Sequence, residues 1–165
     1  MRQKTSYIVF KMAVGWVGIL GSPTGLRCIT LPQPSEKQAL TALGIDDKAT
    51  PAKEYFQDLI RRFRDYFNGR RADFPDKLDL NEATPFQRKV WQAARRIPYG
   101  QTRSYGWIAR QIGKPGAARA VGQALGKNPL PIIIPCHRVL SSDGGLGGFS
   151  GGLKMKKYLL ALEKR

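Results

Sequence analysis

Hydrophobic residues near the start of the chain cluster in short runs that turn-forming residues separate. The runs Tyr7–Phe10, Val14–Leu20 and Leu26–Leu31 are rich in β-branched and aromatic side chains and have the length of strands. Glycine, serine, proline and threonine fill the segment 21–25, which indicates a turn. The pattern predicts a small antiparallel sheet.

The apolar pattern then changes to helical spacing. Thr50 and Pro51 have the sequence of an N-cap followed by proline at the first helical position. Asn68-Gly69 is typical of a helix end. The polar segment 70–83 is predicted to be a linker, so that the chain divides into an N-terminal domain, 1–83, and a C-terminal domain, 84–165. The apolar positions of the predicted helix are Tyr55, Phe56, Leu59, Ile60, Phe63, Tyr66 and Phe67.

Helices are predicted throughout the C-terminal domain. Thr84 and Gln87 have the spacing of a capping box, with Pro85 at the first helical position. The segment 98–100, Pro-Tyr-Gly, ends this first helix. One apolar stripe follows the capping box and consists of Phe86, Val90, Ala94 and Ile97.

Two further helices are predicted at 104–111 and 117–127, joined by the turn 113–116. A helix, a short glycine-containing turn and a second helix outline a helix-turn-helix. Small residues on the second helix would let its backbone approach a DNA groove closely, with Arg119 as the long side chain near its start. Close packing between helices would explain the small residues equally, and the charge described below favours DNA. The small residues are Ala117, Ala118, Ala120, Gly122, Ala124 and Gly126.

These elements define the expected fold class. We expect a mixed α/β (α+β) chain, with a small N-terminal antiparallel sheet plus a helix. A mainly helical C-terminal domain with a helix-turn-helix follows it.

Positive charge is concentrated in the C-terminal domain. The 165 residues contain 28 Lys+Arg and 12 Asp+Glu, a formal net charge of +16. Residues 1–83 hold 13 basic and 10 acidic residues, a net of +3, whereas residues 84–165 hold 15 and 2, a net of +13. A half so basic is expected to bind a polyanion, and nucleic acid is favoured over a membrane surface.

Composition excludes several classes of protein. No apolar run approaches the ~20 residues that cross a bilayer, and no signal for export is visible, so we expect a cytoplasmic or nucleoid-associated protein with no membrane partner. Cys28 and Cys136 are expected to be thiols in a reducing compartment. With His137 as the only histidine, the chain cannot complete a four-ligand Cys/His zinc site, and no metal is expected.

The candidate chemistry centres on Cys136, His137 and Arg138, which are consecutive. A thiolate is the reactive form of cysteine, and a neighbouring imidazole and cation are expected to lower the pKa of the thiol. Neighbours on an extended segment point to opposite faces, so contact between them requires a turn or a bridging water. An inert, buried cysteine beside an exposed histidine is the alternative.

Two neighbouring segments favour a reactive cysteine. The glycine-dense loop 143–152 could fold over a flat ligand and offer backbone N–H groups to it. A final helix is predicted from Leu153, and Glu163 lies at the edge of its apolar stripe. A carboxylate placed there could orient His137, as the third member of a nucleophile, base and orienter set.

The C-terminal domain resembles the DNA alkyltransferases that repair 6-O-methylguanine, the methylated-DNA–protein-cysteine methyltransferases. The resemblance runs in order through nearly all of residues 84–165, whereas residues 1–83 fit the family only loosely. The matching segments are 97–100 with Thr102, Ser104 and Tyr105, then 118–122, Asn128-Pro129, 135–139, 148–152 and 159–163.

The resemblance implies a catalytic set. Cys136 would accept the alkyl group, His137 would activate it through a bridging water, and Glu163 would orient the imidazole. Tyr105 would rotate the 3′ phosphate and donate a proton toward the guanine ring. Asn128 would be the turn residue that joins the helix-turn-helix to the active-site segment.

The resemblance also implies how substrate is bound. Arg119 would enter the duplex and fill the space left by the flipped nucleotide, and further DNA contacts would come from Arg138, Tyr105, Ala118, Ala120 and Gly122. The pocket would be formed by Pro131, Val139, Phe149 and Ser150, with the carbonyls of Cys136 and Val139 on the guanine amine and the Ser150 N–H on its oxygen. Phe149 stands where some members of the family have tyrosine, so a hydrogen bond from that hydroxyl is not expected.

The function expected from this resemblance is the repair of double-stranded DNA that contains 6-O-alkylguanine. The methyl group would pass irreversibly to Cys136, once per molecule and without a cofactor. We expect a monomer, and the sequence leaves open whether copies cooperate along DNA. Two other functions are a lesion-sensing DNA-binding module, in which such a cysteine is absent, and a Cys-His-Glu thiol hydrolase, which would turn over repeatedly.

Overall fold

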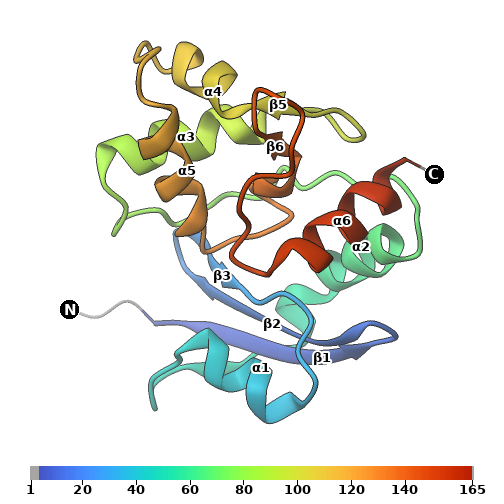
Figure 1. Cartoon of the computed structure of the whole chain (residues 1–165). Helices are drawn as coiled ribbons and strands as arrows, with labels where there is room; N and C mark the ends of the chain where they lie inside the picture. Colours follow the sequence, from blue (N-terminus) through green and yellow to red (C-terminus); the bar gives the residue numbers. More distant parts are fainter. Residues whose placement is uncertain (1–3, 165) are drawn as a thin grey trace. The chain divides into compact units, whose positions relative to one another are not determined.

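A computed structural model of the chain describes residues 4–164 (Figure 1). A four-stranded sheet comes first and is followed, in the second half, by mainly helical structure. The predicted fold class is therefore confirmed. The chain divides into two compact units, Met1–Leu80 and Asn81–Arg165.

The sheet of the first unit has the strand order β3-β2-β1-β4. Strands β1 (Ser6–Met12), β2 (Gly15–Ser22) and β3 (Gly25–Ile29) are joined by tight turns and pair antiparallel, as predicted. The short β4 (Thr50–Pro51) pairs parallel with the start of β1. The sheet is thus mixed rather than wholly antiparallel.

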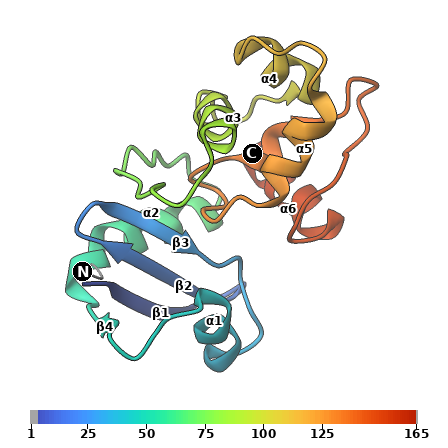
Figure 2. The same cartoon turned by 90° about the vertical axis from the view of Figure 1, so that its left-hand side faces the viewer.

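Two helices lie on opposite faces of this sheet (Figures 1 and 2). Helix α1 (Glu36–Leu43) packs on β1 and β2, and a Cβ added at Gly18 would stand only 2.8 Å from the side chain of Leu43. Helix α2 (Gln57–Phe67) follows a turn of 3-10 helix, η1 (Glu54–Phe56). The buried side chains of α2 are Leu59, Ile60, Phe63 and Tyr66.

The structure corrects two features of the predicted N-terminal domain. Thr50 and Pro51 do not cap a helix, because the Thr50 N–H is bonded to the carbonyl of Thr5 in a strand pairing. Helix α1 was not predicted, although Ser35 caps its start by accepting from the N–H of Gln38. Strand pairing between distant segments overrides a local cap signal, which explains the first error.

The polar segment before the second unit is attached to the edge of the sheet. The Lys77 carbonyl accepts from the Leu26 N–H at 2.9 Å, and the Asp79 N–H donates to the Leu26 carbonyl at 2.7 Å. The buried Asp79 carboxylate accepts from the Ser22 hydroxyl at 2.6 Å and from Arg27 at 2.9 Å. This part of the predicted linker is therefore fixed to β3.

The described part of the second unit contains four α-helices, namely α3 (Pro85–Arg95), α4 (Tyr105–Gln111), α5 (Ala118–Gly126) and α6 (Leu153–Glu163). The capping box at α3 is confirmed, with both the Thr84 and the Gln87 side-chain bonds formed. Helices α3, α4 and α5 pack together, and α4, a turn and α5 form the helix-turn-helix.

A two-stranded parallel pairing positions the candidate site. Strand β5 (Arg103–Ser104) pairs with β6 (Val139–Leu140), which follows the 3-10 turn η2 (Cys136–Arg138). Since Tyr105 begins α4 directly after β5, the pairing brings the start of the helix-turn-helix to the cysteine segment.

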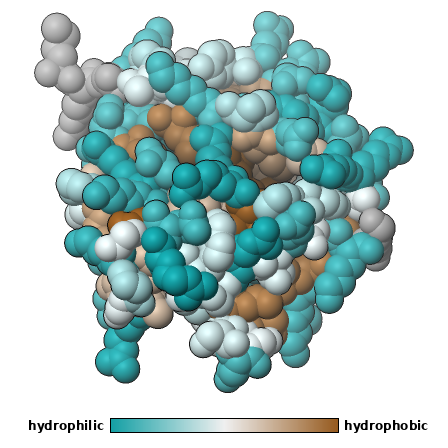
Figure 3. Space-filling model, turned by 90° about the horizontal axis from the view of Figure 1, so that it is seen from above, coloured by the Kyte–Doolittle hydropathy of each residue, from teal (hydrophilic) through white to brown (hydrophobic). Residues whose placement is uncertain are grey.

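On the face of the molecule that Figure 3 shows, hydrophilic side chains surround recessed hydrophobic ones. Of the helices within residues 4–164, none is long and apolar enough to pass through a bilayer.

The buried Asp79 carboxylate gives a prediction for stability. Asp79→Ala leaves the buried Ser22 hydroxyl and the one-third-exposed Arg27 guanidinium without this acceptor, and loss of a hydrogen-bond partner by a buried polar group typically costs about 1–3 kcal/mol. We expect urea denaturation to show a loss of that size. Asp47→Ala, which removes an exposed carboxylate from the same unit, serves as the control. Equal stability of the two variants would contradict the assigned role.

Candidate active site

Cys136 lies in a turn whose conformation is fixed by hydrogen bonds. Its thiol is buried, and its N–H donates to the Ile134 carbonyl at 2.7 Å. The Asn128 amide donates to the Ile134 carbonyl at 2.8 Å and to the Cys136 Sγ at 3.1 Å, while its Oδ1 accepts from the Leu130 N–H. Asn128 thus connects the end of α5 to the sulfur, as the resemblance implied for the turn residue.

The same turn contains strained backbone. Ile132 has φ of 75°, and within residues 4–164 it is the only residue other than glycine at positive φ. A β-branched side chain there costs on the order of 1–3 kcal/mol. The hydrogen bond from the Ile134 N–H to the Leu130 carbonyl, at 2.8 Å, closes the turn around Ile132. Tertiary contacts therefore hold the cysteine segment in one conformation.

The environment of Cys136 corrects the expected acidity of the thiol. Burial raises the pKa of Cys136, and the Asn128 hydrogen bond and the charge of Lys156 oppose this only in part. His137 and Arg138 do not supply the expected lowering of the pKa, because both side chains bind Glu163. The resting thiol is therefore protonated near neutral pH and needs a base when it reacts.

Glu163 accepts hydrogen bonds from three directions. Its Oε2 lies 2.5 Å from the His137 Nε2, and its Oε1 accepts from the Arg138 Nε at 2.8 Å and from the Gly100 N–H at 3.2 Å. Burial alone would raise the pKa of Glu163, but the bonds from His137 and Arg138 outweigh it and lower the pKa to about 2. The carboxylate is therefore ionised.

This carboxylate determines the state of His137. Burial lowers the pKa of His137, and the hydrogen bond to Glu163 opposes this. Because Arg138 already balances the charge of Glu163, a protonated imidazole would leave a buried net positive charge. An ionised carboxylate at 2.5 Å requires the proton on Nε2, so the buried Nδ1 is the basic nitrogen.

Arg138 has a different position from the one expected of a DNA-binding residue. Its guanidinium is buried, donates to both oxygens of Glu163 and donates to the Ile97 carbonyl at 2.8 Å. A guanidinium with these partners cannot at the same time extend to a phosphate. The predicted DNA contact of Arg138 is replaced by a structural role in holding Glu163.

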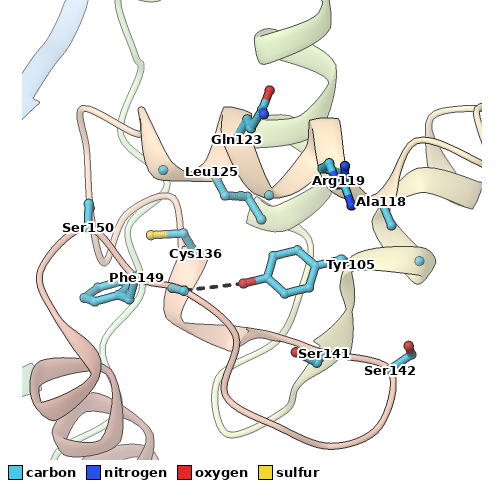
Figure 4. A pocket seen from close by; sticks show the side chains of 14 residues that line it. Tyr105, Ala118, Arg119, Gln123, Leu125, Cys136, Ser141, Ser142, Phe149 and Ser150 are labelled. Atoms are coloured by element: carbon cyan, nitrogen blue, oxygen red, sulfur yellow. Dashed lines mark hydrogen bonds between the residues drawn. The ribbon is translucent and has the colours of Figure 1, made fainter.

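A cavity of about 700 Å³ opens in front of Cys136 (Figure 4). This volume is in the range of small-molecule sites. Cys136 and Phe149 lie on one side of it, and Arg119, on α5, lies on another. The lining residues are Tyr105, Gly106, Ala118, Arg119, Gly122, Gln123, Leu125, Gly126, Cys136, Ser141, Ser142, Gly148, Phe149 and Ser150.

The structure brings half of the predicted site residues to this cavity. Those that line it are Tyr105, Ala118, Arg119, Gly122, Cys136, Phe149 and Ser150. His137 and Glu163 are buried and do not line it, Ala120 is exposed on α5, and Pro131 and Val139 are buried outside the lining. The predicted place of the Pro131 side chain in the pocket wall is therefore not seen.

Sequence analysis missed several residues of the site. Gln123 and Leu125 line the cavity from α5, and Ser141 and Ser142 line it from the loop after β6. Lys156, one turn into α6, is buried beneath that loop. A lysine inside the sequence Lys154-Met-Lys-Lys157 is indistinguishable from its exposed neighbours unless the face of the helix is known.

The described residues provide no metal centre. Within residues 4–164, His, Cys, Asp and Glu side chains do not gather in a group of three that could hold an ion. The side chains of the site itself are a thiol at a cavity, a neutral imidazole and a carboxylate that orients it.

The fold and the site together define a class of protein. It is a helix-turn-helix protein whose cysteine lines a cavity and is followed in sequence by a histidine that is hydrogen-bonded to a buried glutamate. Residues 85–165 match the family described as "6-O-methylguanine DNA methyltransferase, DNA binding domain". A methylated-DNA–protein-cysteine methyltransferase of Methanosarcina acetivorans is 40% identical over 157 residues, which cover 95% of this chain and 97% of the relative. One of Mycolicibacterium paratuberculosis is 54% identical over 110 residues, covering 67% and 66%.

Comparison with solved structures leads to the same family. Mycobacterium tuberculosis OGT in complex with DNA matches with a TM-score of 0.81 and 42% identity over 96% of this chain and 92% of that one. The O6-methylguanine-DNA methyltransferase of Pyrococcus kodakaraensis matches with a TM-score of 0.71 and 26% identity, over 98% and 99%. The chain belongs to the methylated-DNA–protein-cysteine methyltransferase family.

Glu163 gives a prediction for the pH dependence of stability. A carboxylate whose pKa falls from 4.5 to about 2 on folding stabilises the protein above pH 4.5 and loses that contribution as pH falls to about 2. The contribution is about 3 kcal/mol. Denaturation between pH 5 and 2 should show a smaller loss of stability in Glu163→Gln than in wild type.

Exposed Glu82 lies in the same unit and provides the matched control. Glu82→Gln should retain the pH dependence of wild type. If Glu163→Gln retains it as well, Glu163 is not the group that titrates.

Proposed function

We propose that this protein repairs 6-O-alkylguanine in duplex DNA by transferring the alkyl group irreversibly to Cys136. The observation that carries the proposal is the position of the Cys136 thiol at a cavity that α5 of the helix-turn-helix also lines. Membership of the family supports the reaction, and the DNA complex of the Mycobacterium tuberculosis relative supports the partner.

DNA binding is assigned to α5 and the basic surface around it. Ala118 and Gly122 have small side chains where α5 lines the cavity, so the backbone of α5 can approach a DNA groove closely. Arg119 is exposed and lines the cavity, so it can enter the stack where a nucleotide has left. The net charge of +13 on residues 84–165 supplies the phosphate attraction, which falls steeply with salt.

The cavity is proposed to hold the flipped base. Phe149 offers an apolar face and Ser150 a backbone N–H beside Cys136. The carbonyl of Cys136 is assigned to the exocyclic amine of guanine. The Val139 carbonyl, which the resemblance also implied for this contact, accepts instead from the Lys156 ammonium at 2.7 Å, and Val139 is buried outside the cavity lining. Tyr105 lines the same cavity and is assigned to the 3′ phosphate and to proton donation toward the ring. Burial raises the pKa of Tyr105, which keeps its hydroxyl protonated as a donor.

The chemical step follows from these positions. His137 accepts the thiol proton at Nδ1 through a bridging water while Nε2–H remains bonded to Glu163. The Cys136 sulfur attacks the alkyl carbon, a C–S bond forms, and the C–O bond breaks with its electron pair on guanine. Tyr105 gives one proton to guanine, and the proton on His137 returns to Tyr105 through water, so the net change moves the thiol proton to guanine. Within the described residues nothing is placed to cleave the resulting thioether, so each molecule reacts once.

The site is complete within one chain, which supports action as a monomer. Its reacting residues come from α4, α5, η2 and α6 of a single unit. We assign the protein to the cytoplasm or nucleoid, where its DNA substrate lies. Cooperative binding along DNA is a separate property that sedimentation on long duplexes would measure.

Stoichiometric labelling tests the proposed reaction. After mixing with duplex that contains 6-O-methylguanine, mass spectrometry should find one added methyl group per molecule, on the peptide that holds Cys136. Cys136→Ala should lose transfer and keep DNA binding. Cys28→Ala is the matched control and should transfer normally. Repeated turnover, or methyl on Cys28, would refute the proposal.

Substitution of Arg119 tests base flipping. Arg119→Ala removes the side chain that fills the gap in the duplex, so transfer at limiting DNA should slow by about tenfold or more. Fluorescence of 2-aminopurine beside the lesion reports flipping directly and should fall. Lys48→Ala removes one exposed charge from the other unit and should change neither signal. Normal flipping in Arg119→Ala would contradict the assignment.

A further inference from the structure

The exposed face of α5 presents two long side chains. The exposed residues of this helix are Arg119, Ala120, Gln123 and Gly126. Ala120 and Gly126 have a methyl group and no side chain, so of these four only Arg119 and Gln123 extend well beyond the backbone. The proposed function assigns Arg119 to the gap in the duplex, whereas Gln123 has no assigned role.

Gln123 lies at the border between two cavities. It lines the cavity in front of Cys136, and it also lines a second cavity of about 530 Å³, to which Thr84 and Gln87 contribute from the start of α3. Its side chain points away from Cys136 (Figure 4). A duplex that places one nucleotide in the first cavity therefore meets Gln123 at the rim of that cavity.

The Gln123 amide has its hydrogen-bonding groups available for a partner outside the protein. A glutamine side chain has two N–H donors and one carbonyl acceptor. Within residues 4–164, no residue forms a hydrogen bond with the side chain of Gln123. The side chain of Gln87, across the second cavity, is instead used in the capping box of α3.

The geometry of α5 sets the distance between Gln123 and Arg119. The two residues are four positions apart, so they lie on one face of the helix and are separated by about 6 Å along its axis. Base pairs of B-DNA follow one another at about 3.4 Å. When Arg119 occupies the gap left by a flipped nucleotide, Gln123 lies beside a base pair one or two steps away.

An amide at this position can distinguish bases, which a cation on a phosphate cannot. Contacts with phosphate position a protein on the duplex and carry no sequence information. The neighbouring donor and acceptor of a glutamine amide match a base edge that offers an acceptor beside a donor. Adenine offers N7 and its 6-amino group in the major groove, and guanine offers N3 and its 2-amino group in the minor groove. Both bases are purines.

We propose that Gln123 is a specificity-determining residue that binds a purine one or two base pairs from the lesion and makes repair faster in that sequence context. The inference rests on the proposed function, because it takes α5 to lie against DNA with Arg119 in the stack. Gln123 does not touch the alkyl group or the sulfur. Its hydrogen bonds stabilise the complex with the flipped nucleotide and so raise the transfer rate at limiting DNA.

Single-turnover transfer on a panel of duplexes tests the proposal. Each of the four base pairs is placed at every position within two steps of 6-O-methylguanine. Wild type should react fastest with one purine at one position, by about fivefold or more, the lower end of what two hydrogen bonds to a base discriminate. Gln123→Met keeps the length of the side chain without the donors and the acceptor, and should reduce the preference to about twofold or less.

This preference is a ratio of rates for one variant, so a general loss of activity does not alter it. Gln111→Met is the matched control, since Gln111 is exposed at the end of α4, outside α5. It should keep the wild-type preference. Base analogues then identify the edge that is bound. Inosine in place of guanine removes the 2-amino group and 7-deazaadenine removes N7, and one of the two should abolish the preference.

Three results would overturn the assignment of Gln123. They are equal transfer rates of wild type in all contexts, a preference that persists in Gln123→Met, and a preference that survives both base analogues. In each of these cases transfer itself still occurs, so the proposed function stands. If wild type transfers no methyl group from any duplex, the proposed function fails and the role of Gln123 fails with it.

Discussion

The rest of the active site depends on the buried carboxylate of Glu163. Arg138 and the Gly100 N–H bind it, and together they permit an ionised acid in the interior. Once ionised, the carboxylate requires a proton on the Nε2 of His137 and leaves Nδ1 as a base. A buried thiol whose pKa is raised, beside a neutral base, is unreactive until substrate excludes water and brings an electrophilic carbon to the sulfur. This arrangement suits a protein that can react only once.

A second constraint brings this chemistry to the DNA-binding surface. The pairing of β5 with β6 connects the start of α4 to the segment that follows Cys136. Asn128 makes the corresponding connection from the end of α5, with one amide bonded to both the backbone and the sulfur. Both helices of the helix-turn-helix are therefore fixed to the cysteine segment.

Local signals in the sequence were sufficient to predict most helices of the second unit. The Thr84 capping box predicted α3, and the sequence also placed Glu163 where it could contact His137, which the structure shows. Signals failed where distant segments decide the outcome. Thr50 has the pattern of a cap but pairs with a strand, and Arg138 has the charge of a DNA contact but binds a buried acid. Lys156 could not have been distinguished from Lys157 without knowledge of which face of α6 is buried. The acidity of Cys136 likewise depends on burial, which adjacency in sequence does not show.

The role of Glu163 depends on the protonation state of His137, which can be measured directly. His137 is the only histidine in the chain, so ¹⁵N NMR of histidine-labelled protein yields one unambiguous pair of ring signals. At neutral pH we expect a neutral ring with the proton on Nε2 and an unprotonated Nδ1. A ring protonated on both nitrogens, or one that carries its single proton on Nδ1, would contradict the role assigned to Glu163.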